Sequence, residues 1–134
     1  MKRLFLILIP LYLSGCGDNV AILTKNELKN TFNSDTHAQF STYRFNGTAR
    51  LSIDGTAVLN VAGPGIGNGK DRGKWWLEGN RFCIHWQKAL KGRARCANLS
   101  FDGERPQTEN QRQKFAVREL NTGLKIGSFT ITSR

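Results

Sequence analysis

Acidic side chains, histidines and cysteines are scarce in this chain of 134 residues. Ten Asp and Glu stand against 20 Lys and Arg, which gives a formal net charge of +10, and there are only two histidines and three cysteines. Paired carboxylates for acid–base chemistry are therefore few, and a metal site lacks enough converging ligands. We expect no catalytic residues, no metal and no cofactor.

The chain also has no apolar run long enough to span a bilayer as a helix. A basic start, Met1-Lys2-Arg3, precedes a short apolar stretch over residues 4–13, a pattern typical of an export signal. The stretch ends in Leu13-Ser14-Gly15-Cys16, which resembles the lipobox of bacterial lipoproteins. The resemblance implies cleavage before Cys16 and acylation of this cysteine, for example with palmitate.

This reading divides the chain into three parts: a lipoprotein signal peptide over 1–15, a lipidated tether over 16–23 and a single β domain over 24–134. We expect the protein in the bacterial cell envelope, lipid-anchored and facing the periplasm. Enteric lipoproteins that stay in the inner membrane carry Asp directly after the cysteine. Gly17 occupies that position here, which favours the outer membrane.

Beyond the tether, one helix and about eight short strands are expected. Thr24 and Glu27 fit a capping box, which predicts a helix near residues 25–32. From Phe40 onward, apolar and polar residues alternate between turn signals, which predicts a small antiparallel barrel or sandwich. A three-residue loop at Asp54-Gly55 would put Leu51 and Ile53 on the face that also carries the apolar residues Ala57, Leu59 and Val61.

The two remaining cysteines are expected to form a disulfide. A two-residue turn at Gly79-Asn80 pairs Trp75 with Ile84 and Trp76 with Cys83. If Cys83 then faces Cys96, Phe82 falls opposite Ala97, and Leu99 and Phe101 share the apolar face. Three strands thus agree on one register, in a compartment where disulfides persist. The parity of the last strand flips between Ile126 and Phe129, which predicts a bulge at Gly127.

Several short motifs together resemble a family of small exported proteobacterial β-barrel domains of unknown function. They are Thr24-x-x-Glu27-Leu28, Asp54-Gly55-Thr56, Gly73-x-Trp75, Gly79, Cys83-x-x-Trp86, Cys96 and an ending with Gly123, Gly127 and Ile131. The likeness covers residues 24–132 and implies the barrel fold and the Cys83–Cys96 disulfide. The family supplies no catalytic residues to carry over.

The glycine-rich stretch "GPGIGNGK" does not match a phosphate-binding loop. Pro64 stands where the first glycine of such a loop should be, and Asp71 follows Lys70 in place of Ser or Thr. The segment after it alternates like a strand, not like a helix. We interpret the stretch as a connection between hairpins, with a contact loop beside a pocket as the alternative.

The basic side chains suggest the function. Trp75, Phe82, Trp86 and Phe101 are expected to fill the interior or to line a ligand cavity. Trp76, on the outer face beside Lys74 and Arg95, either packs on the disulfide or stacks on a sugar or a lipid headgroup. A basic binding rim is expected from Lys70, Arg72, Lys74, Trp76, Lys88, Lys91, Arg93 and Arg95.

We therefore expect a binding or interaction module that meets an anionic envelope partner: a polymer, a lipid headgroup or a protein. The exported anchor argues against nucleic acid. The alternative is a small barrel that carries a small apolar ligand.

Overall fold

The described chain folds into a closed antiparallel β-barrel of eight strands. The computed structural model describes residues 20–42, 46–62, 69–103 and 112–133. The strands are β1 (Thr36–Thr42), β2 (Asn46–Leu51), β3 (Thr56–Ala62), β4 (Lys70–Glu78), β5 (Arg81–Trp86), β6 (Arg95–Phe101), β7 (Gln113–Arg118) and β8 (Lys125–Ser133). The prediction of a mainly β domain is confirmed, and of the two expected architectures the barrel is the one observed.

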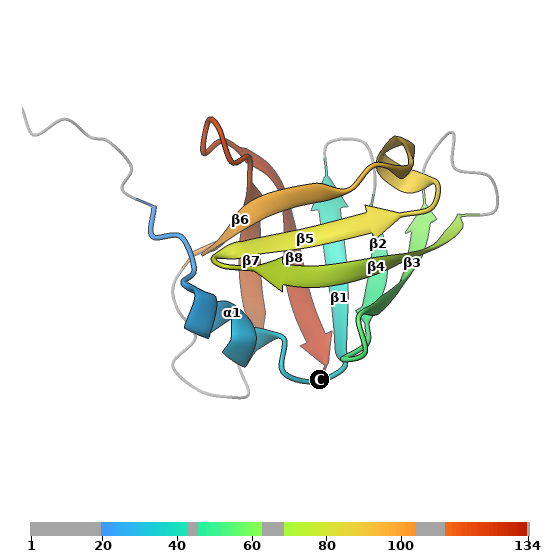
Figure 1. Ribbon diagram of the computed structural model, residues 1–134, viewed down its shortest axis with the longest axis horizontal. Coiled ribbons are helices and arrows are strands. Elements are labelled where there is room, and N and C mark those ends of the chain that lie inside the picture. Colours follow the sequence, from blue (N-terminus) through green and yellow to red (C-terminus); the bar gives the residue numbers. More distant parts are fainter. Residues whose placement is uncertain (1–19, 43–45, 63–68, 104–111, 134) are drawn as a thin grey trace, which may run out of the picture.

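Each strand pairs with the next one in the chain, and β1 pairs with β8 to close the barrel. In Figure 1, β4, β5 and β6 run across the front of the other five strands. Because the strands alternate in direction, every second connection lies at the same end. We call the end with the β1–β2, β3–β4, β5–β6 and β7–β8 connections the upper end, and the opposite end the lower end.

The helix α1 (Lys25–Thr31) covers part of the lower end (Figure 1). It starts at a capping box, in which the Thr24 hydroxyl accepts from the Glu27 N–H at 3.2 Å and the Glu27 carboxylate accepts from the Thr24 N–H at 3.3 Å. These two bonds satisfy backbone donors that a helix start leaves unpaired. The buried face of the helix carries Leu28, and Phe32 follows at its end.

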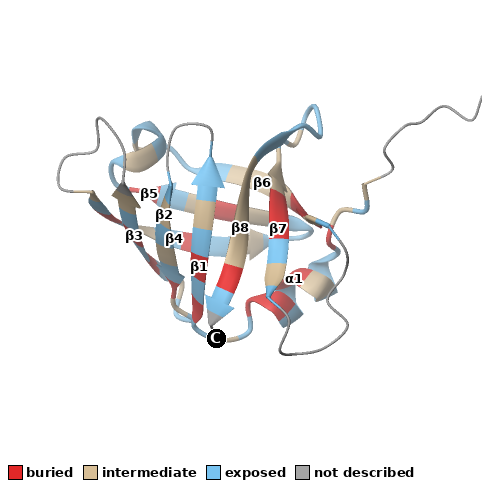
Figure 2. Cartoon of the chain, turned by 180° about the vertical axis from the view of Figure 1, so that it is seen from behind, coloured by how far each residue is buried: buried red, intermediate tan, exposed pale blue. Residues whose placement is uncertain are grey.

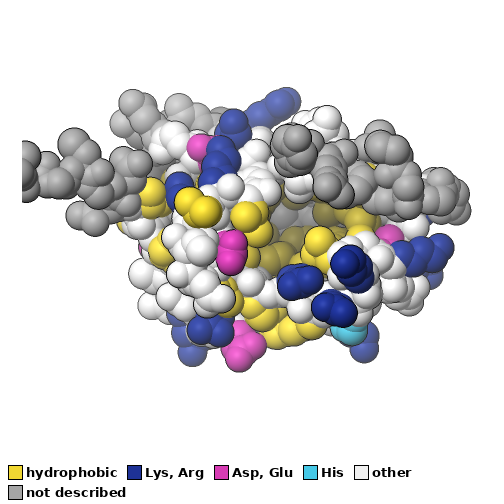
Figure 3. Space-filling view, turned by 90° about the horizontal axis from the view of Figure 1, so that it is seen from above, with side chains coloured by type: hydrophobic (Ala, Val, Ile, Leu, Met, Phe, Trp, Pro, Cys, Tyr) yellow, Lys and Arg dark blue, Asp and Glu magenta, His cyan; other side chains and the backbone are white. Residues whose placement is uncertain are grey.

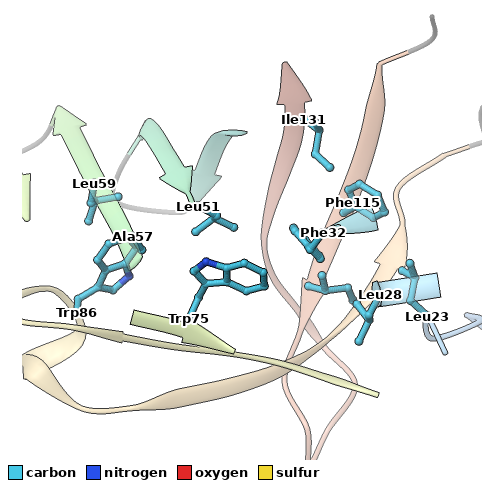
Figure 4. Packing of buried hydrophobic residues seen from close by; sticks show 11 residues of the cluster. Leu23, Leu28, Phe32, Leu51, Ala57, Leu59, Trp75, Trp86, Phe115 and Ile131 are labelled. Carbon is cyan, nitrogen blue, oxygen red and sulfur yellow. The ribbon is translucent and has the colours of Figure 1, made fainter. Parts of the chain in front are cut away.

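An aromatic cluster joins this helix to the barrel wall. The ring of Phe32 lies 5.8 Å from that of Trp75, 5.1 Å from that of Phe82 and 6.3 Å from that of Phe129. The Trp75 indole also donates a hydrogen bond of 2.8 Å to the Ser52 carbonyl, so its polar atom is satisfied inside the core. Figure 4 shows Phe32 and Leu28 lying among the apolar side chains of the strands.

The predicted register of β4, β5 and β6 is confirmed. Trp75 pairs with Ile84, Trp76 with Cys83 and Phe82 with Ala97. Cys83 and Cys96 face each other and form the expected disulfide. The ladder between β5 and β6 contains only three residue pairs, so the covalent bond joins the shortest ladder of the barrel.

Three details differ from the sequence expectations. Strand β1 starts at Thr36, four residues before the alternation that begins at Phe40. The alternation does not reveal this start, because the inner positions carry Thr36 and Ala38 in place of large apolar residues. The three-residue loop after Ser52 is confirmed, but Ile53 lies within it and is 64% exposed. In β8 the extra residue is Ile126, one position before the predicted Gly127, since Val117 pairs with Gly127 and Arg118 with Lys125.

Candidate ligand site at the mouth of the barrel

On one side of the barrel, formed by β7, β8 and β1–β3, the interior is closed towards the lower end and accessible towards the upper end; on β4 and β5 the upper inward positions, Asp71 and Trp86, are buried. On β1, β2 and β3 the inward-pointing residues near the lower end, such as Ala38, Leu51 and Leu59, are buried. Further up the same strands, the inward-pointing Phe40, Ala49 and Val61 are only half-buried. A residue that points inward yet remains accessible must face a space that solvent can enter.

The same gradient is found on the two strands that complete this side. Phe115 on β7 and Ile131 on β8 are buried, whereas Val117 and Phe129, which lie higher on these strands, are half-buried. Figure 2 follows this change along the strands. Figure 3 shows the upper end as a hollow with hydrophobic side chains inside it. We call this opening the mouth; its walls carry Phe40, Val61 and Val117, and Ala49 and Phe129 lie further inside.

Two glycines allow aromatic rings to lie against the walls. A Cβ atom on Gly47 would come within 3.0 Å of the Phe40 ring, and one on Gly73 would come within 2.9 Å of the Trp86 indole. Both glycines sit at inward positions, opposite the aromatic residue on the neighbouring strand. The backbone carbonyl oxygens of Asn60 and His85 would be closer still, so each glycine is required by the approach of a neighbouring strand as well as by the ring.

Every buried side-chain nitrogen or oxygen in the described residues has a hydrogen-bond partner. The inward-facing Asp71, for example, accepts from three backbone N–H groups. The buried part of the described interior therefore offers apolar contact and no unsatisfied polar group, a combination that suits an apolar chain more than a sugar or a nucleotide.

Asp71 is a buried carboxylate at the upper end, 4% exposed, on the inward face of β4. Its Oδ2 accepts from the backbone N–H groups of Lys88 at 2.9 Å and Ala89 at 2.7 Å, and its Oδ1 accepts from the N–H of Arg72 at 2.8 Å. Burial acts to raise the pKa of Asp71, but the hydrogen bonds from Ala89, Lys88 and Arg72 outweigh it, and the pKa lies below 3.8. Asp71 thus holds the β5–β6 connection against β4.

That connection contains a strained turn. The short helix η1 (Ala89–Gly92) has Leu90 at φ 54° and Lys91 at φ 58°, followed by Gly92 at φ 63°. Side chains with a Cβ rarely adopt this left-handed region, which costs about 1–2 kcal/mol per residue. The strain is held in place by Asp71 and by a hydrogen bond of 2.9 Å between the His85 Nε2 and the Gly92 carbonyl oxygen.

The structure brings most of the expected basic rim together at the upper end. Lys88, Lys91 and Arg93 are exposed on the β5–β6 connection, and Lys70 and Arg72 are exposed at the start of β4. The two segments are joined, since the Gln87 N–H donates to the Arg72 carbonyl at 2.9 Å. In Figure 3, Lys and Arg side chains gather on one side of the hollow.

Arg95 lies apart from the outer surface on which it was expected. It pairs with the inward-facing Ile84, so its register position belongs to the inner face, at the upper end of β6. Trp76, in contrast, is on the outer face and 37% exposed, next to Lys74 on the same strand. The neighbour of Trp76 across the ladder is Cys83, which is fully buried although it points outward. We infer that the indole covers the disulfide.

Three other features bear on the site. Cys16 and residues 63–68 of the glycine-rich stretch lie outside the described residues. A depression of about 360 Å³ on the outer surface of β1–β3 is lined mainly by polar side chains, including His37, Arg50 and Asn60. Among the described residues, Glu78, Cys83 and Cys96 are the one group of possible metal ligands close together, but both thiols are used in the disulfide.

The part of the chain that the structure describes contains no helix with the length and apolar character needed to cross a membrane. No protein-family model, no curated protein and no solved structure matched the chain.

Proposed function

We propose that this protein is a cell-envelope lipoprotein whose barrel binds a small ligand with an apolar chain. The observation that carries the proposal is the burial gradient on β7, β8 and β1–β3: on these strands the inward-pointing apolar side chains are buried towards the lower end and accessible towards the mouth. Small barrels that are open at one end can hold one small ligand inside. Of the two functions that the sequence suggests, the geometry favours the carrier.

The size of the wall residues supports this choice. On β2, Gly47 is level with Phe40 and Val61 at the mouth and the half-buried Ala49 follows below it, so this strand contributes little side-chain volume to the upper interior. The cluster around Phe32 and Trp75 closes the lower end, so a chain that enters from above ends on an apolar floor. Burial of each methylene of such a chain contributes about 0.8 kcal/mol.

The proposal is tested with cis-parinaric acid, a polyene fatty acid whose fluorescence rises in apolar surroundings. Titration of the full chain should give saturable binding of one molecule per protein. Ala49→Phe puts a large ring into the interior below the mouth and should abolish binding, whereas Thr48→Phe, on the exposed outer face of the same strand, should not. Equal binding by both variants would place the ligand outside the barrel.

Native mass spectrometry of the purified protein gives an independent test, since a carried ligand should appear as an added mass. A second candidate function, contact with an anionic envelope partner, is favoured by the exposed Lys88, Lys91 and Arg93 beside the mouth. The chemical class of that partner follows from the residues around these cations.

A further inference from the structure

We infer that the upper end of the barrel docks on an anionic lipid leaflet, so that the mouth faces the lipid surface. This specifies the partner of the second proposed function and does not require the interior to hold a ligand. The surface consists of three exposed apolar residues, Leu90, Leu124 and Ile126, and the three cations Lys88, Lys91 and Arg93.

The exposed apolar residues are not spread evenly over the molecule. Six large apolar side chains in the described residues are exposed, and three of them lie in or beside upper-end connections: Leu90 at 51%, Leu124 at 63% and, at the start of β8, Ile126 at 53%. Leu90 is on the β5–β6 connection, and the other two are on the hairpin between β7 and β8. These two connections flank the mouth in Figure 1, so the apolar residues lie on two sides of it.

Two of these apolar residues lie at local irregularities of the backbone. Leu90 has a left-handed conformation that the buried Asp71 helps to hold, and Ile126 is the extra residue of the β8 bulge. Strain and bulges of this kind are found preferentially at functional sites.

The charge around Leu90 specifies the partner. Lys88, Lys91 and Arg93 are exposed within three residues of this leucine. A surface with apolar residues among cations fits the boundary between headgroups and acyl chains of an anionic leaflet, where apolar side chains insert and cations meet phosphates. A soluble anionic polymer would satisfy the cations but leave the apolar residues in water.

The chain enters the barrel beside β6. The Leu23 N–H donates to the Leu99 carbonyl at 2.7 Å, and Ile22 forms a bridge to Ser100. Both Leu99 and Ser100 lie near the lower end of β6 (Arg95–Phe101), above α1 (Figure 1). Five residues lie between Cys16 and Ile22, and an extended chain over these six steps spans about 20 Å. Docking of the upper end therefore requires the tether to run along the outside of the barrel towards the leaflet.

The test measures which end of the full chain contacts lipid. Asn121→Cys places an environment-sensitive NBD fluorophore at the tip of the β7–β8 hairpin, and Asn30→Cys places it on α1 as the matched control; both positions are exposed. In vesicles of phosphatidylethanolamine and phosphatidylglycerol, the label at 121 should brighten and shift to shorter wavelength, and the label at 30 should not. The same result at both positions would overturn the proposal.

Two sets of variants separate the apolar and the charged contribution. Leu90→Ser with Leu124→Ser and Ile126→Ser should remove the spectral shift at 121, whereas Ile53→Ser, equally exposed at the lower end, should leave it unchanged. Replacing Lys88, Lys91 and Arg93 with Gln should lower the ratio of docked to undocked protein roughly 100-fold. Replacing Lys25, Lys29 and Arg81 with Gln, which removes three exposed cations at the lower end, is the charge-matched control.

Salt and lipid composition give the remaining outcomes. The shift should weaken as salt rises from 0.1 to 1 M, because the screening length falls from about 10 Å to about 3 Å. An undiminished shift in pure phosphatidylcholine would contradict the role of the cations. Ala49→Phe should still dock, so loss of fatty-acid binding with intact docking would separate this inference from the carrier function.

Discussion

The Oδ2 atom of Asp71 accepts a hydrogen bond of 2.7 Å from the backbone N–H of Ala89, which lies 18 residues further along the chain. This contact joins the inner face of β4 to a turn that contains two residues in the left-handed region. A single buried carboxylate thereby holds a strained segment at the edge of the mouth.

Asp71→Asn should lower the free energy of unfolding by about 1.5–3 kcal/mol, the range for hydrogen bonds to a charged group. The pKa of Asp71 is lowered in the folded state, so its stabilising effect is present above pH 3.8 and is lost as the pH falls below that value. The difference between wild type and variant in urea denaturation should therefore shrink in acid. Glu119→Gln, at an exposed position, is the control and should show no comparable difference.

Phe32→Ala should destabilise the protein by about 3–5 kcal/mol, because the ring packs against three aromatic rings of the barrel at its closed end. Asn30→Ala on the exposed side of α1 should have little effect. Chemical denaturation measures both. A loss below about 1 kcal/mol for Phe32→Ala would mean that the helix contributes little to the closure of the lower end.

The double variant Cys83→Ser and Cys96→Ser should lose about 3 kcal/mol of stability in the chain-entropy model for a loop of this length. Because β5 and β6 share only three residue pairs, we expect the loss to appear first in hydrogen exchange along this ladder. Faster exchange along β2 and β3 with no change in β5 would contradict this expectation. Non-reducing mass spectrometry of a tryptic digest should link the two cysteine peptides in the wild type.

Cys16→Ser should abolish incorporation of radiolabelled palmitate, since the sequence before this residue resembles a lipobox. The label is followed by autoradiography of the purified protein. Cys83→Ser provides a cysteine control, because it leaves the expected acylation site intact. Equal labelling of wild type and Cys16→Ser would show that Cys16 is not the acylated residue.

Sequence patterns were sufficient to predict the pairing of those strands that have a clear turn or a cysteine. The turn at Gly79-Asn80 and the two cysteines determine the register of three strands, and the structure has that register. Strand β1 was only partly predicted, because Thr36 and Ala38 give no apolar alternation to detect. The bulge was displaced by one residue, since a change of parity locates an insertion only within a short interval.

The mouth and the role of Asp71 could not be derived from the chain alone. Alternation predicts which side chains point inward, but how far each of them remains accessible depends on the tilt of the strands and the closure of the barrel. Asp71 shares the inward positions of β4 with Gly73, Trp75 and Leu77. An acidic residue among inward positions predicts a buried carboxylate with hydrogen-bond donors around it. Its partners, Lys88 and Ala89, belong to a connection whose conformation has no local sequence signature.

The barrel cannot close until its last strand is available, because β1 pairs with β8. Phe40 pairs with Phe129 in this ladder, so almost the whole domain lies between two residues that must meet. Until β8 is available, β1 and β7 present unpaired edges that can join other chains. A chain delivered across a membrane from its N-terminus would expose both edges throughout its passage, and we expect it to depend on a holding chaperone until its last strand arrives.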